Sequence, residues 1–434
     1  MADFYVNVAT GNDANPGTLA GPVRSIAQAI DLAAVSPDAT GTIFVAAGTY
    51  EPPNERFPLL MRPGYVLQGE GRDRTLIRFT GETRIITGTM TTYWGGTAVI
   101  AGSAVRDIAI RANPFPEGFT CNGTIGLQAN NDGTIIENVD VLAPELPEDR
   151  RVFARGPGRS AEPLQTGFSL SVLIYANVTY RNSRVSHSTH VVVAAGDSTL
   201  VDNVRLEWSF MGVSSNARVQ NCEFRWVTVS PATGSASPLV TIVDGSPTIG
   251  PNNYFDMSAR PVIDCRQNST PTIIQNEIAV FYQPALSIRE GASARVIGNR
   301  VFSDYTYDRA ILEIAPDAGS GSMFEENTFY GSPHTFNIQA PADFGAGAAG
   351  SRGGNHFGPM WASNKLVFDI PTGGVINAQN NFWNEGRSDS QTSVGPTTTL
   401  ITTGAVVDPI TPDEGLIQFR DILSSHPYSR GRMS

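Results

Sequence analysis

Short runs of alternating apolar and polar residues recur along most of the chain, separated by turns rich in Gly, Asn, Asp and Pro. This alternation is typical of β-strands, whose successive side chains point to opposite faces. A short helix is predicted near the amino terminus, where an apolar pattern with helical spacing begins at Ile26 and ends before Pro37. No amphipathic helix of useful length is predicted within the later repeats, so the pattern indicates an all-β chain.

One phrase returns along the chain: an apolar strand, a polar turn, then Asn followed by alternating apolar residues. From Asn182 to Asn381 it spans 199 residues in eight steps, which gives a mean period of about 25. The repeated asparagines are Asn138, Asn182, Asn203, Asn221, Asn253, Asn276, Asn299, Asn327, Asn355 and Asn381. We expect them at one turn of each repeat, because Asn tolerates the left-handed conformation and its amide can bond to the next repeat.

Strands that recur with this period and without crossover helices can satisfy their backbone only by pairing with the equivalent strand of the next repeat. The sequence therefore predicts a parallel β-helix, a solenoid of about 11–12 coils whose rungs lie about 4.8 Å apart. An open end of such a solenoid is an exposed sheet edge, so a cap is required. The predicted amino-terminal helix is the candidate for that cap.

The opening segment FYVNVATGNDANPGTLAGPVRSIAQAIDLAA, followed by GTIFVAAGTY, resembles the entry segment of the pectate-lyase-like right-handed β-helix superfamily. The resemblance implies that the GNDANPGT loop leads into a helix that plugs the solenoid and that the strand ending in GTY begins the first coil. It covers the fold over roughly residues 3–385. The superfamily includes lyases, hydrolases, epimerases and phage tailspikes, so the resemblance assigns no single activity.

Three segments are expected along the chain. Residues 1–50 form the amino-terminal cap, and residues 51–385 form the β-helix, interrupted by a polar insertion at 144–167 that we expect to be a loop on one rung. Residues 386–434 form a tail, threonine-rich at first, that is expected to cap the coil, associate with neighbouring chains or anchor the protein.

The formal net charge of −11 argues against nucleic acid as a partner, because proteins that bind it concentrate positive charge. No apolar run is long enough for a membrane span, and no classical secretion signal is recognised at the amino terminus. Cys121, Cys222 and Cys265 are widely spaced and form no metal-binding motif. We expect no cofactor and no metal.

The repeat aligns one strand of the later coils, so that equivalent residues stack in a column. The middle residues of these strands should point outward: Thr241, Asp264, Ser287, Glu313, Asn337 and Asp369. The next outward position contributes Arg266 and Arg289. We expect this face to be acidic, polar and solvent-exposed.

Asp264 and Glu313 lie two rungs apart in this column, about 9.6 Å between backbones from twice the strand spacing. Their side chains could converge to the separation of about 6.5–9.5 Å that inverting glycosidases use. One would protonate the glycosidic oxygen and the other would activate water. Arg266 or Arg289 would bind a sugar carboxylate, with Ser287 as a further substrate contact. The alternative is a ladder of ion pairs without chemistry.

Exposed aromatic rings are a second indication of a sugar ligand, because the CH faces of sugars pack on them. Tyr305 and Tyr307, in the polar run SDYTYDR, are the predicted substrate-binding rings. The polygalacturonase-like and alginate-epimerase-like signatures of the superfamily are absent from the sequence. The single lysine, Lys365, has no acidic cluster beside it in the sequence, which leaves a calcium-dependent lyase unsupported.

These features favour a phage tailspike-like virion protein, a homotrimer that recognises and possibly cleaves a bacterial surface polysaccharide and attaches to other virion proteins. One alternative is a secreted pectate-lyase-like hydrolase or lyase. Another is a non-catalytic structural or decoration β-helix. The expected location is the virion or the extracellular space.

Overall fold

The computed structural model describes most of the chain between residues 1 and 359 and short strands beyond it. The described residues are 1–79, 84–86, 92–94, 97–112, 124–142, 170–186, 189–193, 196–207, 209–227, 238–258, 261–280, 284–304, 310–332, 334–345, 347–359, 366–369, 375–378, 382–383 and 399–401. The predicted insertion at 144–167 lies outside them, as does the tail 386–434 apart from its strand at 399–401. All structural statements below concern the described residues.

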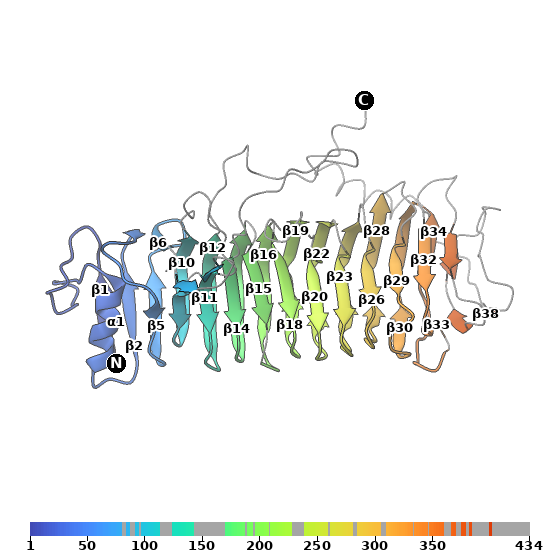
Figure 1. The fold of residues 1–434 in the computed structure, drawn as a ribbon, viewed down its shortest axis with the longest axis horizontal. Helices are drawn as coiled ribbons and strands as arrows, with labels where there is room; N and C mark the ends of the chain where they lie inside the picture. Colours follow the sequence, from blue (N-terminus) through green and yellow to red (C-terminus); the bar gives the residue numbers. More distant parts are fainter. Residues whose placement is uncertain are drawn as a thin grey trace, which may run out of the picture.

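The chain winds into an elongated stack of parallel strands that follow one another along the long axis in sequence order (Figure 1). Helix α1 (Ile26–Val35) lies at the amino-terminal end, against the first two strands. The predicted parallel β-helix with an amino-terminal helix is therefore confirmed. Connections between parallel strands of one sheet are strongly biased to the right-handed sense, which is the sense expected of the coil.

Two parallel sheets form the solenoid, and a small antiparallel pair accompanies them. Sheet A contains β1 (Ala2–Val6), β2 (Gly41–Val45), β3 (Gly48–Tyr50), β5 (Tyr65–Gly69), β6 (Thr75–Phe79), β10 (Ala104–Ala112), β12 (Thr134–Leu142), β14 (Val178–Ser186), β16 (Leu200–Glu207), β18 (Arg218–Gln220), β19 (Glu223–Val227), β21 (Thr248–Ile249), β22 (Tyr254–Ser258), β24 (Thr272–Ile274), β25 (Glu277–Val280), β27 (Arg295–Ile297), β28 (Arg300–Asp304), β30 (Ser322–Glu325), β31 (Thr328–Ser332), β33 (Ala342–Gly345), β34 (His356–Pro359), β36 (Val375–Ala378), β37 (Phe382–Trp383) and β38 (Thr399–Ile401). Sheet B contains β4 (Leu59–Leu60), β9 (Thr97–Ala101), β11 (Thr124–Ala129), β13 (Leu170–Ile174), β15 (Thr189–Val193), β17 (Phe210–Val213), β20 (Val240–Val243), β23 (Ile263–Arg266), β26 (Leu286–Ile288), β29 (Leu312–Ile314), β32 (His334–Ile338) and β35 (Leu366–Asp369). The antiparallel pair is β7 (Arg84–Ile86) with β8 (Thr92–Trp94).

A typical coil contributes one strand to sheet B and two segments to sheet A. The coil with β17 continues into β18 and β19, which pair with the two halves of β16 in the preceding coil. Alternation along each strand sends every second side chain into the core, where Phe224 stacks on Phe255 with ring centroids 4.6 Å apart. The core is therefore a continuous column of apolar side chains that gains one layer with each coil.

The repeated asparagines occupy two positions and not one, which differs from the expectation. Asn138, Asn182, Asn203 and Asn221 adopt positive φ angles of 54°, 52°, 52° and 53° at the corner between the two segments of sheet A. From Asn253 to Asn355 the repeated Asn comes one residue after the corner residue with positive φ, and its side chain is buried. The first group serves the corner backbone, as expected, whereas the second group fills the interior of the turn.

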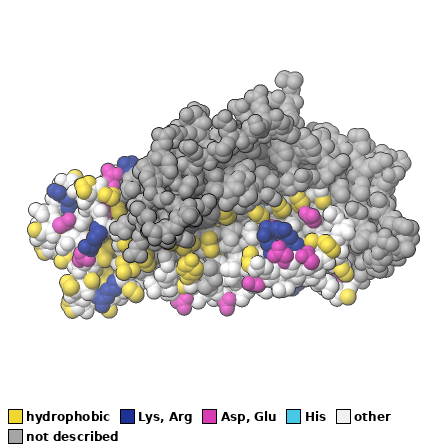
Figure 2. Space-filling view, in the orientation of Figure 1, with side chains coloured by type: hydrophobic (Ala, Val, Ile, Leu, Met, Phe, Trp, Pro, Cys, Tyr) yellow, Lys and Arg dark blue, Asp and Glu magenta, His cyan; other side chains and the backbone are white. Residues whose placement is uncertain are grey.

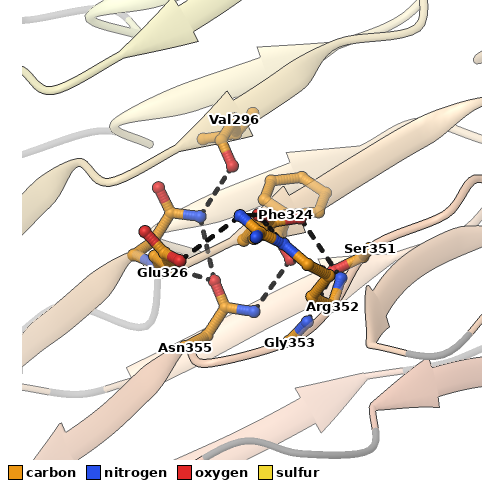
Figure 3. Close-up of polar contacts among 9 residues, drawn as sticks. Val296, Phe324, Glu326, Ser351, Arg352, Gly353 and Asn355 are labelled. Carbon is orange, nitrogen blue, oxygen red and sulfur yellow. Dashed lines mark hydrogen bonds and ion pairs between the residues drawn. The ribbon is translucent and has the colours of Figure 1, made fainter.

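The buried asparagines form a ladder along the axis. The Nδ2 groups of Asn276, Asn299 and Asn327 donate to the Oδ1 atoms of the next Asn at 2.9, 3.0 and 2.9 Å. Figure 3 shows the end of this ladder, where Asn355 donates to the carbonyl oxygen of Phe324 at 2.9 Å. Each amide thus satisfies backbone groups that would otherwise be buried without partners.

The amino-terminal helix is held at its first turn by the side chains of Ser25 and Glu55. Ser25 is its N-cap, with Oγ accepting from the backbone N–H of Gln28 at 3.1 Å. Glu55 reaches back from the first coil, and its two carboxylate oxygens accept from the N–H groups of Ile26 and Ala27 at 2.7 and 2.8 Å. Such contacts satisfy the free donors of a helix start. None of the described helices is long and apolar enough to cross a membrane.

Glu55 makes the stability of this cap depend on pH. Burial raises the pKa of Glu55 from 4.5 to about 7, although hydrogen bonds from the N–H groups of Ala27, Ile26 and Arg56 act in the opposite direction. The folded state therefore holds a proton that the unfolded chain releases between pH 4.5 and 7. This contribution to stability is present at low pH and is lost as pH rises to 7, by about 3 kcal/mol.

We expect Glu55→Gln to remove this dependence, since the variant carries no titrating group at the site. The measurement is denaturant unfolding of both proteins at pH 5 and pH 8, with Glu70→Gln, an exposed carboxylate, as the control. The stability difference between wild type and Glu55→Gln should change between the two pH values. A difference that stays constant contradicts the prediction.

Candidate functional site

The column predicted from the repeat is present on sheet B. Asp264 pairs with Ser287, Ser287 with Glu313, and Glu313 with Asn337 in successive strands. The same column begins with Thr241 opposite Asp264 and continues to Asp369 opposite Asn337. The predicted register is confirmed at each of these pairs.

Asp264 departs from the expected environment, because its side chain is fully buried instead of facing solvent. Arg289 donates to both carboxylate oxygens, with Nε to Oδ1 at 3.0 Å and Nη2 to Oδ2 at 2.8 Å. Arg266 donates to Oδ2 through Nε at 2.6 Å and also through Nη2. The carboxylate is therefore enclosed by two guanidinium groups, which compensates the cost of burying its charge.

The two arginines remain partly accessible above this buried carboxylate. Their side chains are 30% exposed for Arg266 and 36% for Arg289. The hydrogen bonds to Asp264, together with the nearby charges of Glu290 and Glu313, raise the pKa of Arg289. Basic and acidic side chains gather on the visible face at the position that β23 and β26 occupy in Figure 1 (Figure 2).

The other predicted residues of this face lie beside the arginines. Ser287 is 4% exposed, so the expectation that it faces solvent is also wrong. Glu313 is half-buried and forms no ion pair within the described part of the chain. Among the described side chains of the column, Glu313 is thus the carboxylate without an ion pair. Tyr305 and Tyr307 fall outside the described residues, so their predicted contact with substrate stays a prediction.

The polar stack extends one coil further than the predicted site. Gln339 stands two residues after Asn337, as Arg266 does after Asp264, and its Nε2 donates to Asn337 Oδ1 at 2.8 Å. The signal for Gln339 in the sequence is its place two residues after Asn337, which matches the spacing of Arg266 from Asp264. Toward the amino terminus the same outward column is mainly apolar, with Leu60, Ile100, Gln128, Leu173 and Val192.

This arrangement can bind polar ligands through donors and acceptors held on adjacent rungs. Guanidinium groups supply fixed N–H donors, and the Glu313 carboxylate supplies acceptors and a proton-transfer group. Within the described residues, no group of three His, Cys, Asp or Glu side chains is placed to hold a metal ion.

Residues 9–139 match a family described as a protein of unknown function (DUF1565). The match covers the cap and the first coils. No curated protein sequence matches the chain.

Solved structures to which the chain is similar include the mannuronan C-5 epimerase AlgE4 A-module from Azotobacter vinelandii. It is 16% identical and has a TM-score of 0.44, over 92% of this chain and 100% of that one. Two others are the catalytic domain of a GH87 α-1,3-glucanase (9% identity, TM-score 0.43) and a GH136 lacto-N-biosidase from Eubacterium ramulus (11% identity, TM-score 0.41). Each covers 92% of this chain over 68% of its own length.

The strands of sheets A and B pair in parallel with the equivalent strands of the neighbouring coils. The entry segment, the capping helix and the coils follow one another as the sequence resemblance implied. By its strand pairing, the chain is a parallel β-helix protein with a helix at its amino-terminal end.

Proposed function

We propose that the protein binds a bacterial surface polysaccharide along the outer face of sheet B, as a tailspike-like component of a virion. The observation that carries this proposal is the stack of Arg266, Arg289 and Glu313 on neighbouring rungs. A polysaccharide is an extended chain that repeats hydroxyl and charged groups, and rungs about 4.8 Å apart present matching partners at regular intervals. The rigid coil holds these partners in place before the ligand binds, which lowers the entropic cost of association.

The homotrimer, the attachment to other virion proteins and the virion or extracellular location are parts of the same proposal. Their support comes from the sequence, in particular from the threonine-rich segment within residues 386–434. Light scattering of the purified protein measures the oligomeric state directly. A monomer that acts on a glycan would favour the secreted enzyme instead.

We further propose that Glu313 performs proton transfer if the bound glycan is cleaved. The catalytic role predicted for Asp264 remains to be tested, and its geometry is unfavourable for that role. Oδ1 of Asp264 accepts from Arg289, Oδ2 accepts from both arginines, and the side chain is fully buried, so it is poorly placed to reach a water molecule or a leaving-group oxygen. Glu313 lacks such partners in the described structure and can reach a ligand.

We expect Glu313→Gln to reduce glycan cleavage at least 100-fold, because general acid or base catalysis contributes about 10²–10⁴ to the rate. The assay is release of reducing ends from a panel of bacterial surface polysaccharides. Glu277→Gln, a surface carboxylate on sheet A, is the control and should keep full activity. Unchanged cleavage in both Glu313→Gln and Asp264→Asn would show that this column is not the catalytic site.

A non-catalytic binding protein is the second candidate function, and the enclosure of Asp264 favours it. An inverting glycosidase needs a pair of free carboxylates, whereas of the two predicted catalytic carboxylates Asp264 is enclosed and Glu313 alone lacks an ion pair among the described residues. A protein of this class would retain a polysaccharide from the panel and release no reducing ends.

A further inference from the structure

Each arginine of the sheet B site uses only one edge of its guanidinium group on Asp264. In both side chains the bonds to the carboxylate come from Nε and Nη2. A guanidinium group has five N–H donors in a fixed planar fork, so the edge formed by Nη1 and the second N–H of Nη2 is left over. Among the described residues, no contact to Nη1 of Arg266 or Arg289 is present.

Asp264 fixes the relative placement of the two forks. Arg289 follows Arg266 by one coil, because its backbone N–H donates to the carbonyl oxygen of Cys265 at 3.0 Å. The buried carboxylate lies between the two side chains and bonds to both, so neither guanidinium can turn without losing a charge-assisted bond. The two guanidinium groups are thereby held beside one shared carboxylate, while their side chains stay 30% and 36% exposed.

We propose that Arg266 and Arg289 form a paired receptor for the carboxylate of an acidic sugar, and that Asp264 is the positioning residue of this receptor. The inference rests on the proposed polysaccharide-binding function and adds the class of polymer, one that contains uronic acid units. A carboxylate matches the spacing of N–H groups along a guanidinium edge and gains charge-assisted bonds that a neutral hydroxyl does not. Glu313, on the strand after Ser287, would then accept a hydrogen bond from a hydroxyl of the same or the next sugar.

Asp264→Asn separates positioning from simple electrostatics. The substitution removes a negative charge next to the site, and on electrostatic grounds alone it should tighten the binding of an anion. If Asp264 positions the two forks, the same substitution should weaken uronate binding at least fivefold, because the arginines lose their common anchor. Tighter or unchanged binding in a folded Asp264→Asn protein would overturn the positioning role.

Arg289→Lys tests the receptor without removing its charge. Lysine can still pair with Asp264, but a compact ammonium group has no second planar edge for a ligand. Dissociation constants for sodium D-glucuronate and D-galacturonate, measured by saturation-transfer NMR on the full chain, should rise at least tenfold in this variant. Arg218→Gln removes an exposed arginine from sheet A and should leave them unchanged. D-Glucose and D-galactose are the neutral counterparts and should bind more weakly to the wild type than the uronates.

The outcomes distinguish this inference from the proposed function. The inference fails if uronates bind the wild type no better than the neutral sugars, or if Arg289→Lys binds them equally well. A polysaccharide that is retained equally before and after chemical reduction of its carboxyl groups also overturns it, while leaving polysaccharide binding intact. Retention of no polysaccharide from the panel, with uronate binding lost in Arg289→Lys, would instead remove the proposed function.

Discussion

Replacing Asn299 with alanine is expected to lower the free energy of unfolding by about 3 kcal/mol, because buried polar groups lose their partners. The Asn299 side chain is fully buried. Its Oδ1 accepts from the backbone N–H of Asn276 at 3.0 Å, and its Nδ2 donates to the carbonyl oxygen of Ile273 at 2.8 Å. Alanine can do neither, so a backbone donor is left unsatisfied in the core.

Asn299→Asp is expected to be at least as damaging, although it preserves shape. A carboxylate still accepts from Asn276, but it cannot donate to Ile273 or to Asn327 Oδ1, which Asn299 contacts at 3.0 Å. It would also place a charge in the core without a cation. Denaturant unfolding at fixed protein concentration measures both variants against the wild type.

The matched control is Asn182→Gly, at an asparagine of the other position in the same sequence phrase. Asn182 is exposed and has a φ of 52°, a conformation that glycine adopts without strain. We expect a change within about 0.5 kcal/mol. Equal losses at Asn182 and Asn299 would contradict the distinction between corner and ladder asparagines.

Asp264→Asn is the second substitution with a large expected effect, a loss of about 3 kcal/mol in the free energy of unfolding at neutral pH. It leaves two arginines facing each other without the carboxylate that they share. This loss is at the lower end of the range expected for breaking a buried ion pair. The two arginines are 30% and 36% exposed, so water can solvate them once the carboxylate is gone.

A double-mutant cycle identifies the cause of this loss. Asp264→Asn should cost less in an Arg289→Gln background, because one of the two unpaired charges is then already absent. A coupling of about 1 kcal/mol or more between the two sites is expected from direct contact. Additive losses would show that Asp264 contributes through packing and not through its ion pairs.

The repeat determined the architecture and the register of sheet B. Side chains alternate with a period of two along each strand, and equivalent strands stack in parallel, so one correct alignment places every residue of the column. That is why Asp264, Ser287 and Glu313 lie on adjacent strands as predicted. The helix at Ile26–Val35 could also be predicted from the sequence, because its apolar spacing and its flanking residues are local signals.

Burial and hydrogen-bond partners could not be obtained from the same pattern. Arg266 and Arg289 reach back over Asp264, and their choice of partner depends on rotamers and on the space above the strand. Glu55 accepts a hydrogen bond from the backbone N–H of Ile26, and no sequence pattern predicts this pairing. The two asparagine positions share one sequence phrase. Only the structure shows which Asn has the left-handed backbone of the corner and which has a buried side chain in the ladder.

The sequence by itself therefore determined the coil, its cap and the column that carries the candidate chemistry, because these follow from local periodicity repeated many times. The tertiary structure decided which carboxylate is enclosed and which is open. Asp264 and Glu313 occupy equivalent places in the repeat, yet two arginines enclose the first while the second remains half-buried without an ion pair among the described residues. That difference arises from side-chain contacts between coils, which depend on three-dimensional proximity and not on position within the repeat.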